Sequence, residues 1–371
     1  MSTRRRPLAQ VRSDLRVAWY RSPVEPGILR ELMRRSDRRG WLQAGGHLAL
    51  FAVTGSLAYL CWVHQWWVVF AAAMFAHGTI GSFFRGLATH ELNHGTVFST
   101  RWLNKLFLYV YALLSWDNPF HHSASHRFHH RYTLHPAGDR ETVLPVRPSL
   151  RLALMVQMFT VNLWGGRRSL GLGGLLPIIL DTVLAAAGVI DGEWAAAVVA
   201  DRAAAKRKSV WWSRLVLLFH GLVAAYAAWS GNWGLPLVIS CFPFVANWWA
   251  YFVGLPMHAG LRNNVPDFRK CTRTITLDPF SEFIYWHMNW HTEHHMYSGV
   301  PCYNLAKLSR EIADDMPAPR TLVQAWREMR RTWRRQRYDP SYQFDTPLPV
   351  TARPTPPRHD GLTEAIEGPV T

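Results

Sequence analysis

Residues 40–84 read GWLQAGGHLALFAVTGSLAYLCWVHQWWVVFAAAMFAHGTIGSFF and contain no Asp, Glu, Lys or Arg. Residues 215–261 also lack these four residue types. A bilayer span needs about 20 apolar residues, so each stretch can form two helices joined by a turn. Buried helices of a soluble protein would carry charges on one face. The sequence therefore predicts an all-α polytopic membrane protein with four transmembrane helices in two hairpins, at about 44–62, 66–84, 215–230 and 235–255.

The formal charge of +16 is concentrated outside these stretches. Residues 1–39 hold eleven Arg against four acidic residues, and residues 320–337 are also rich in Arg. We expect the protein to be embedded in the inner or plasma membrane. By the positive-inside rule, both termini and the middle segment then lie on the cytoplasmic side. No nucleic-acid-binding motif accompanies the basic residues, so the charge does not indicate a nucleic-acid partner.

The remaining segments divide the chain into three parts. Residues 1–39 form a basic cytoplasmic lead with a helix around residues 26–35, residues 40–337 form the membrane domain, and residues 338–371 form a Pro-rich disordered tail. Residues 152–166 are too short to span a membrane, and residues 169–190 contain Asp181 and Pro177. We expect both to be helices on the membrane surface or on the cap, followed by an amphipathic helix at 193–208.

Three histidine clusters lie outside the predicted spans: HELNH at residues 90–94, HRFHH at 126–130 and HTEHH at 291–295. Spacings of three and four residues place side chains on one face of a helix, and the first cluster is expected on a continuation of the second span. Two hairpins return all three clusters to one side of the bilayer. Neutral imidazole binds iron, zinc, copper and nickel, and eight imidazoles suit two ions. The eight histidines are His90, His94, His126, His129, His130, His291, His294 and His295.

Two other functions use parts of this pattern. His90-Glu91-Leu-Asn-His94 matches HExxH, in which two histidines bind zinc and the glutamate is the general base of a metalloprotease. That interpretation leaves six clustered histidines without a role. A metal transporter would need ligands inside the spans, whereas these clusters lie beyond the ends of the helices.

The three clusters and their flanking residues resemble the membrane-bound fatty acid desaturase and hydroxylase superfamily. The similar segments are SHRFHHRYTLHPAGD at 125–139 and MNWHTEHHMYSGVPCYNL at 288–305, and the second is close to sphingolipid and acyl-lipid desaturases, including bacterial members. The resemblance covers roughly residues 45–315. It implies four spanning helices, a cytoplasmic helical cap, and a non-haem di-iron site held by the eight cluster histidines. A ninth imidazole just after the fourth span corresponds to His258.

The resemblance also implies the reaction, that of a non-haem di-iron oxidoreductase. A desaturase of this superfamily uses O2 to introduce a C=C bond into an acyl chain or a similar amphiphilic substrate. The alternative outcome is hydroxylation, which begins with the same hydrogen abstraction. The chain lacks an HPGG haem segment and plant-type Cys spacing, so we expect reducing equivalents from a ferredoxin-type donor with an NAD(P)H reductase. Its expected docking surface is a basic face with Arg127, Arg131, Arg269, Lys270, Arg273 and the 320–337 helix.

Several further side chains need structural roles. We expect His47, His64, His77 and His220, in or beside the spans, to be hydrogen-bonded packing residues. His121, His122, His135 and His287 lie near the clusters without a defined role. Metal-bound imidazole usually donates its second N–H to a carboxylate or carbonyl. The candidate carboxylates are Glu91, Asp139, Glu141, Asp267 and Glu293.

Overall fold

The computed structural model describes residues 6–142, 144, 149–165, 173–190, 192–201 and 203–355. It is 63% helical with almost no sheet, as the sequence predicts. The α-helices of these residues are α1 (Leu8–Asp14), α2 (Pro26–Leu32), α3 (Asp37–Gly40), α4 (Gly46–Val63), α5 (Trp67–Gly81), α6 (Thr89–His94), α7 (Arg101–Leu114), α8 (Pro119–Tyr132), α9 (Leu152–Phe159), α10 (Leu175–Ala186), α11 (Glu193–Asp201), α12 (Ala203–Ser230), α13 (Gly234–Ile239), α14 (Trp248–Gly254), α15 (Phe268–Cys271), α16 (Pro279–Ile284), α17 (His291–Met296), α18 (Leu305–Glu311) and α19 (Leu322–Arg335). The strands β1 (Ile275–Thr276) and β2 (Arg320–Thr321) form a short parallel pair.

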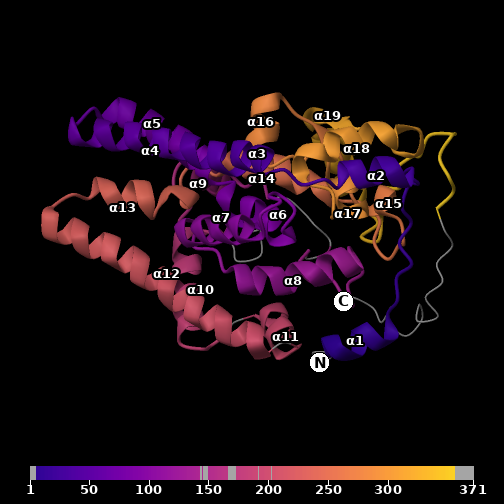
Figure 1. Ribbon diagram of the computed structural model, residues 1–371, viewed down its shortest axis with the longest axis horizontal. Coiled ribbons are helices and arrows are strands. Elements are labelled where there is room, and N and C mark those ends of the chain that lie inside the picture. Colours follow the sequence, from indigo (N-terminus) through magenta and orange to yellow (C-terminus); the bar gives the residue numbers. More distant parts are fainter. Residues whose placement is uncertain are drawn as a thin grey trace.

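Three helices are long and apolar enough to cross a membrane: Asp37–Val63, Trp67–His94 and Ala204–Ser230. In Figure 1, the α4–α5 pair and the α12–α13 pair project to one side of the molecule, and helices α15 and α17–α19 gather at the other. Large apolar side chains such as Val53, Leu57 and Val68 are exposed on the projecting helices. Exposed apolar surface of this extent suits lipid rather than water.

The second span is interrupted before the first histidine cluster. The helix α5 ends at Gly81, and after a π-helical segment (Phe84–Ala88) with a kink at Arg85 and Gly86 the chain enters α6. Gly86 has φ +75°, a left-handed conformation that glycine adopts without strain, and its N–H donates to Thr89 Oγ1 at 3.1 Å. The segment Trp67–His94 therefore carries the first cluster on a continuation of the second span, as predicted, but the continuation is kinked and is not one regular helix. After the kink, α6 packs against α7 and α8.

The helix predicted at 235–255 is broken into three pieces, α13, a 3-10 turn (Phe242–Phe244) and α14. Pro243 lacks a backbone N–H, which prevents a regular helix, and Ala246 has φ +47°. The freed backbone groups find partners in the segment after α9, because Ala246 N donates to Thr160 O at 2.8 Å and Asn162 N donates to Phe244 O at 2.7 Å. The predicted continuous fourth helix is thus corrected to a paired, broken segment.

Two further differences concern the middle of the chain. The amphipathic helix predicted at 193–208 is divided between α11 and the start of α12, and α12 continues from Ala203 through the span predicted at 215–230 as one 28-residue helix. The helix α10 packs along α12, and Arg214 Nε donates to the Ala186 carbonyl at 2.9 Å. The helix α10 therefore covers part of α12, and Asp181 and Pro177 lie within it as the sequence placed them.

Histidines within the hairpins connect helices. His77 Nε2 donates to Val238 O at 3.0 Å, and Thr54 Oγ1 lies 3.0 Å from its Nδ1, which links α4, α5 and α13. His220 Nδ1 lies 2.8 Å from Ser240 Oγ, and its Nε2 donates to Leu113 O at 3.0 Å. His77 and His220 therefore hold helices together, as expected from the sequence, whereas His64 is exposed and stacks on Trp66.

Residues 338–355 are paired with residues 261–270 and are not a disordered tail. Phe344 bridges Leu261 in a parallel β-bridge. Lys270 Nζ donates to Thr346 O at 2.7 Å, and Thr355 Oγ1 donates to Asp267 Oδ2 at 2.9 Å. Paired backbone and side-chain groups compensate for the scarcity of large apolar residues. Residues 356–371 lie outside the described part of the chain.

Part of the predicted basic face is buried in ion pairs. Arg269 is fully buried and pairs with Asp267 and Asp315 at 2.8 and 2.9 Å. Arg273 is also buried and pairs with Glu328 at 2.6 Å. Lys270 is half-buried and pairs with Asp345 at 2.8 Å. These three side chains are therefore not free to dock a partner, which corrects that prediction.

Candidate metal centre

Short helices carry all three histidine clusters. The helix α8 begins where Asn118 Oδ1 accepts from His121 N at 3.2 Å and Pro119 occupies the first position, both favourable at a helix start. The helix α6 ends at Gly95, which has φ +66°. The helix α17 spans only His291–Met296, so all of its histidines lie within two turns.

The imidazoles converge into two groups, within each of which the potential ligand nitrogens all lie within 4.8 Å of one another. The helices α8 and α17 contribute to both groups, because residues four apart share a side of a helix and the residue between them points elsewhere. His258, which follows α14 and a 3-10 turn, joins the smaller group. The first group consists of His90, His94, His126, His130 and His294, and the second consists of His129, His258, His291 and His295.

Within the first group, the Nε2 atoms face one another. His294 Nε2 lies 2.8 Å from His90 Nε2 and 3.2 Å from His130 Nε2, and His126 Nε2 lies 3.3 Å from His94 Nε2. Two imidazoles bound at right angles to an ion, with metal–nitrogen bonds of about 2.1 Å, would have nitrogens about 3.0 Å apart. The observed spacing fits that arrangement.

The second group has the same geometry. His291 Nε2 lies 2.9 Å from His258 Nε2 and 3.1 Å from His295 Nε2. Burial lowers the pKa of all three imidazoles, and that of His258 falls to about 3. They are therefore neutral at physiological pH, the form that binds a metal.

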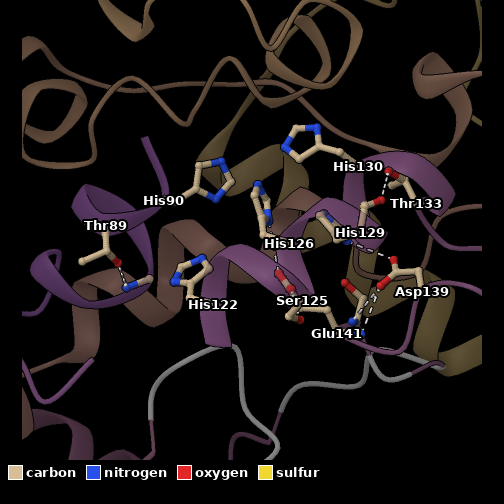
Figure 2. Close-up of polar contacts among 12 residues, drawn as sticks. Thr89, His90, His122, Ser125, His126, His129, His130, Thr133, Asp139 and Glu141 are labelled. Atoms are coloured by element: carbon tan, nitrogen blue, oxygen red, sulfur yellow. Dashed lines mark hydrogen bonds and ion pairs between the residues drawn. The ribbon is translucent and has the colours of Figure 1, made fainter. Parts of the chain in front are cut away.

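The outward nitrogens of several of these rings meet fixed acceptors. His129 Nδ1 lies 2.9 Å from Asp139 Oδ2, as Figure 2 shows, and His258 Nδ1 donates to Cys271 O at 3.1 Å. His126 Nδ1 lies 3.4 Å from Glu141 Oε1. Such contacts fix the ring orientation and leave Nε2 directed inward.

Two more rings have polar neighbours at their outward nitrogens. His295 Nδ1 lies 3.1 Å from Thr133 Oγ1, and His294 Nδ1 lies 3.1 Å from Glu91 Oε1, a close contact without hydrogen-bond geometry. The hydroxyl of Thr133 was not expected from the sequence, although its position one helical turn after His129 could have suggested it. The carbonyl of Cys271 could not have been found, because a backbone oxygen has no residue-specific signal.

Two of the five candidate carboxylates serve elsewhere. Glu293 accepts a hydrogen bond from Thr274 Oγ1 at 2.6 Å, and Asp267 pairs with Arg269. Among the unassigned histidines, His122 lies 3.3 Å from Asp117 Oδ2 through its Nδ1, and His287 lies 2.9 Å from Glu282 Oε1. Neither ring belongs to the two groups.

Nine imidazole nitrogen donors in two adjacent groups fit two transition-metal ions, and the donor type suits iron, zinc, copper or nickel. All nine histidines singled out from the sequence lie in the groups, His258 included. An HExxH zinc site would use His90, His94 and Glu91, yet Glu91 contacts the outward nitrogen of His294. The arrangement therefore favours a two-metal centre over a single zinc site.

Comparison with known proteins agrees with this geometry. A family model described as fatty acid desaturase matches residues 64–327, more than two thirds of the chain, and the match includes all nine histidines. A search of the curated proteins found no match. The family is one of oxidoreductase enzymes, and together with the apolar helices it indicates an integral membrane protein. The chain belongs to the fatty acid desaturase family.

Proposed function

We propose that this protein is an O2-dependent di-iron desaturase that introduces a C=C bond into an acyl chain or a similar amphiphilic substrate. The observation that carries the proposal is the convergence of nine imidazoles into two adjacent groups. The first iron would be held by His90, His94, His126, His130 and His294, and the second by His129, His258, His291 and His295. Membership of the fatty acid desaturase family supports the same assignment.

Two bound irons with O2 supply an oxidant that can attack an unactivated C–H bond, which amino-acid side chains alone cannot do. The chain's own residues contribute position and environment. Asp139, Glu141 and the Cys271 carbonyl hold the rings of ligating histidines in place. Ring positions fixed in this way keep the distance between the centre and a bound C–H bond constant, which is what selects the reacting carbon.

For the membrane arrangement, we propose four crossings with the cap and both termini in the cytoplasm. The first three crossings are the long apolar helices, and α13, the Phe242–Phe244 turn and α14 together make the fourth. A broken helix is tolerated in a membrane where protein groups pair its backbone, as Thr160 and Asn162 do here. The Arg-rich residues 1–39 support this orientation.

Anaerobic reconstitution with iron, followed by product analysis by mass spectrometry, tests the function. We expect about two irons per chain and products two hydrogens lighter than the substrate when an acyl-lipid panel and small amphiphiles are supplied with O2 and a reductant. A product heavier by one oxygen would identify a hydroxylase built on the same centre. A single tightly bound zinc with no oxidised product would overturn the proposal.

The variant Glu91→Gln is expected to retain most of its activity. Glu91 Oε1 lies beside the outward Nδ1 of His294, and the amide oxygen of glutamine can take the same place. In a zinc protease, loss of this general base would reduce turnover by about 10²–10⁴-fold. Steady-state oxidation rates and iron content of the variant check the expectation, and near-complete inactivity with two irons still bound would contradict it.

For electron delivery, we propose that an acidic ferredoxin-type donor docks on α19. This helix exposes Arg327, Arg330, Arg331, Arg334 and Arg335. It also packs against the 3-10 turn Leu255–Met257, which directly precedes His258 of the second histidine group. Complementary charge raises association rates in a salt-dependent way.

The double variant Arg330→Glu/Arg334→Glu is expected to slow iron reduction by ferredoxin about tenfold or more at low salt, with a weaker dependence on ionic strength. Reduction followed by stopped-flow absorbance measures this effect. The double variant Arg34→Glu/Arg35→Glu, which reverses two exposed arginines before α3, is the matched control. Equal rates for both variants would exclude α19 as the docking surface.

A further inference from the structure

A pocket of about 670 Å³ opens directly onto the candidate metal centre. Its lining includes His94, His126 and His130 of the first group and His295 of the second. A molecule in this pocket therefore contacts rings of both groups. The volume lies within the range of small-molecule sites, about 300–1,000 Å³.

The pocket is strongly basic. Its lining contains five arginines, Arg12, Arg16, Arg21, Arg127 and Arg131, and no Asp or Glu. The guanidinium groups of Arg21 and Arg131 lie over the rings of Tyr297 and Tyr132, with centroid distances of 5.9 and 5.4 Å. These cation–π contacts restrict where the two guanidinium groups lie, and carboxylates and phosphates bind a guanidinium through its N–H groups.

One wall of the pocket comes from the N-terminal segment between α1 and α2. Trp19 fixes this wall, because its ring stacks on Phe268 with a centroid distance of 4.0 Å and its Nε1 donates to Arg131 O at 2.9 Å. In Figure 1 this segment runs down the side of the molecule opposite the projecting hairpins. The wall thus faces away from the proposed membrane, so a ligand can enter from water.

We propose that this pocket binds the anionic group, a carboxylate or a phosphate, of a water-borne substrate whose reacting carbon then lies at the histidine groups. The inference rests on the proposed function for the reaction, but the binding itself stands on the pocket. The pocket is partly open to water and has the volume of a small-molecule site, so we commit to a small anion as its occupant and make docking of a redox protein an outcome of the test.

The position of the arginines also constrains the substrate. Arg127 and Arg131 directly follow His126 and His130 on α8, so the anion site and the metal centre are adjacent. The oxidised carbon must therefore lie within the length of this one pocket from the anionic group. Arg16 and Arg21 lie in the N-terminal segment, outside the membrane domain, but in this proposal they help to select which substrates the metal centre oxidises.

Equilibrium binding to the iron-loaded, full-length protein in neutral-lipid nanodiscs tests the inference, with no reductant present so that no turnover occurs. The probes are octanoate, octyl phosphate and octan-1-ol, measured by isothermal titration calorimetry with empty nanodiscs subtracted. We expect one or both anions to bind at least tenfold more tightly than the alcohol, and more weakly as salt increases. The better anion distinguishes a free carboxylate from the phosphate of a carrier or headgroup.

The variants Arg16→Gln, Arg21→Gln and Arg131→Gln are each expected to weaken binding of the better anion by about tenfold, the size of a lost charge-assisted hydrogen bond. Arg310→Gln, an exposed residue of α18 outside the pocket, should bind as the wild type does. Equal binding of all three probes, no binding of either anion, or unchanged binding in the three pocket variants would overturn the inference.

Iron content separates this inference from the proposed function. Two irons per chain with binding that ignores the arginines would overturn the pocket assignment and leave the di-iron desaturase intact. A protein that retains no iron but still binds the anion through Arg16, Arg21 and Arg131 would overturn the di-iron desaturase and leave the pocket assignment intact. Slower reduction by ferredoxin in these variants, with probe binding unchanged, would identify a redox-protein surface and also overturn the inference.

Discussion

Replacement of His294 by alanine is expected to lower the iron content from about two ions per chain to about one and to abolish measurable turnover. His294 Nε2 lies 2.8 Å from His90 Nε2 and 3.2 Å from His130 Nε2, so its loss opens the first group at its centre. His129→Ala should remove the iron of the second group instead. The turnover loss should exceed the roughly 10–100-fold cost of losing only a hydrogen-bond partner of a ligand.

The matched control is His64→Ala, because His64 is an exposed histidine at the turn of the first hairpin and stacks on Trp66. It should keep two irons and full activity. Metal analysis of the purified proteins, together with circular dichroism to confirm folding, gives the comparison. Two irons and normal turnover in both His294→Ala and His129→Ala would refute the ligand assignment.

The second large effect is expected for Asp139→Ala, although Asp139 binds no metal in our proposal. Its Oδ2 lies 2.9 Å from His129 Nδ1 and 3.0 Å from the backbone N of Leu134, and its Oδ1 accepts from Glu141 N at 3.1 Å. Removing the carboxylate frees the His129 ring and leaves the backbone N–H groups of Leu134, Glu141 and Thr142 without this acceptor. We expect iron in the second group to be held about 10–100-fold more weakly.

Asp139→Asn should fall between the wild type and Asp139→Ala, because an amide oxygen still accepts hydrogen bonds but carries no charge. Glu282→Gln is the matched control: Glu282 also contacts a histidine, His287, at 2.9 Å, but that ring lies outside both groups. Iron retention against a chelator provides the measurement. Equal retention in Asp139→Ala and Glu282→Gln would show that Asp139 does not support the centre.

Hydropathy and helical periodicity predicted the parts of this protein that depend on neighbouring residues. The first hairpin is found at the predicted place, since an uncharged run of this length has few alternatives to a pair of apolar helices. The histidines of α8 and α17 share helix faces because residues three and four apart lie close together on any α-helix. These features follow from local geometry.

The fourth predicted span illustrates where hydropathy was insufficient. Its composition is apolar throughout, but Pro243 and the left-handed Ala246 interrupt the helix. The interruption is stable because Thr160 and Asn162, more than 80 residues earlier, pair the freed backbone groups. A window of sequence contains no information about such a distant partner.

Charge was equally dependent on the tertiary structure. Arg269 and Arg273 look like surface cations in the sequence but are buried in ion pairs with Asp315 and Glu328. In contrast, Arg16 and Arg21 of the N-terminal segment line the pocket at the metal centre. The sequence shows which residues carry a charge, whereas the folded structure determines which partner neutralises that charge.

The sequence by itself determined the helical membrane-like fold, the eight clustered histidines as the candidate ligands and, through its resemblance to a known superfamily, His258 as the ninth. The tertiary structure decided that these nine rings divide into groups of five and four, which carbonyl and hydroxyl groups hold their outward nitrogens, and which arginines surround the pocket. The physical reason is the separation along the sequence between the residues that interact. Helix formation and face sharing depend on residues within about four positions, whereas a metal centre requires nitrogens from segments up to 200 residues apart to meet within a few ångströms.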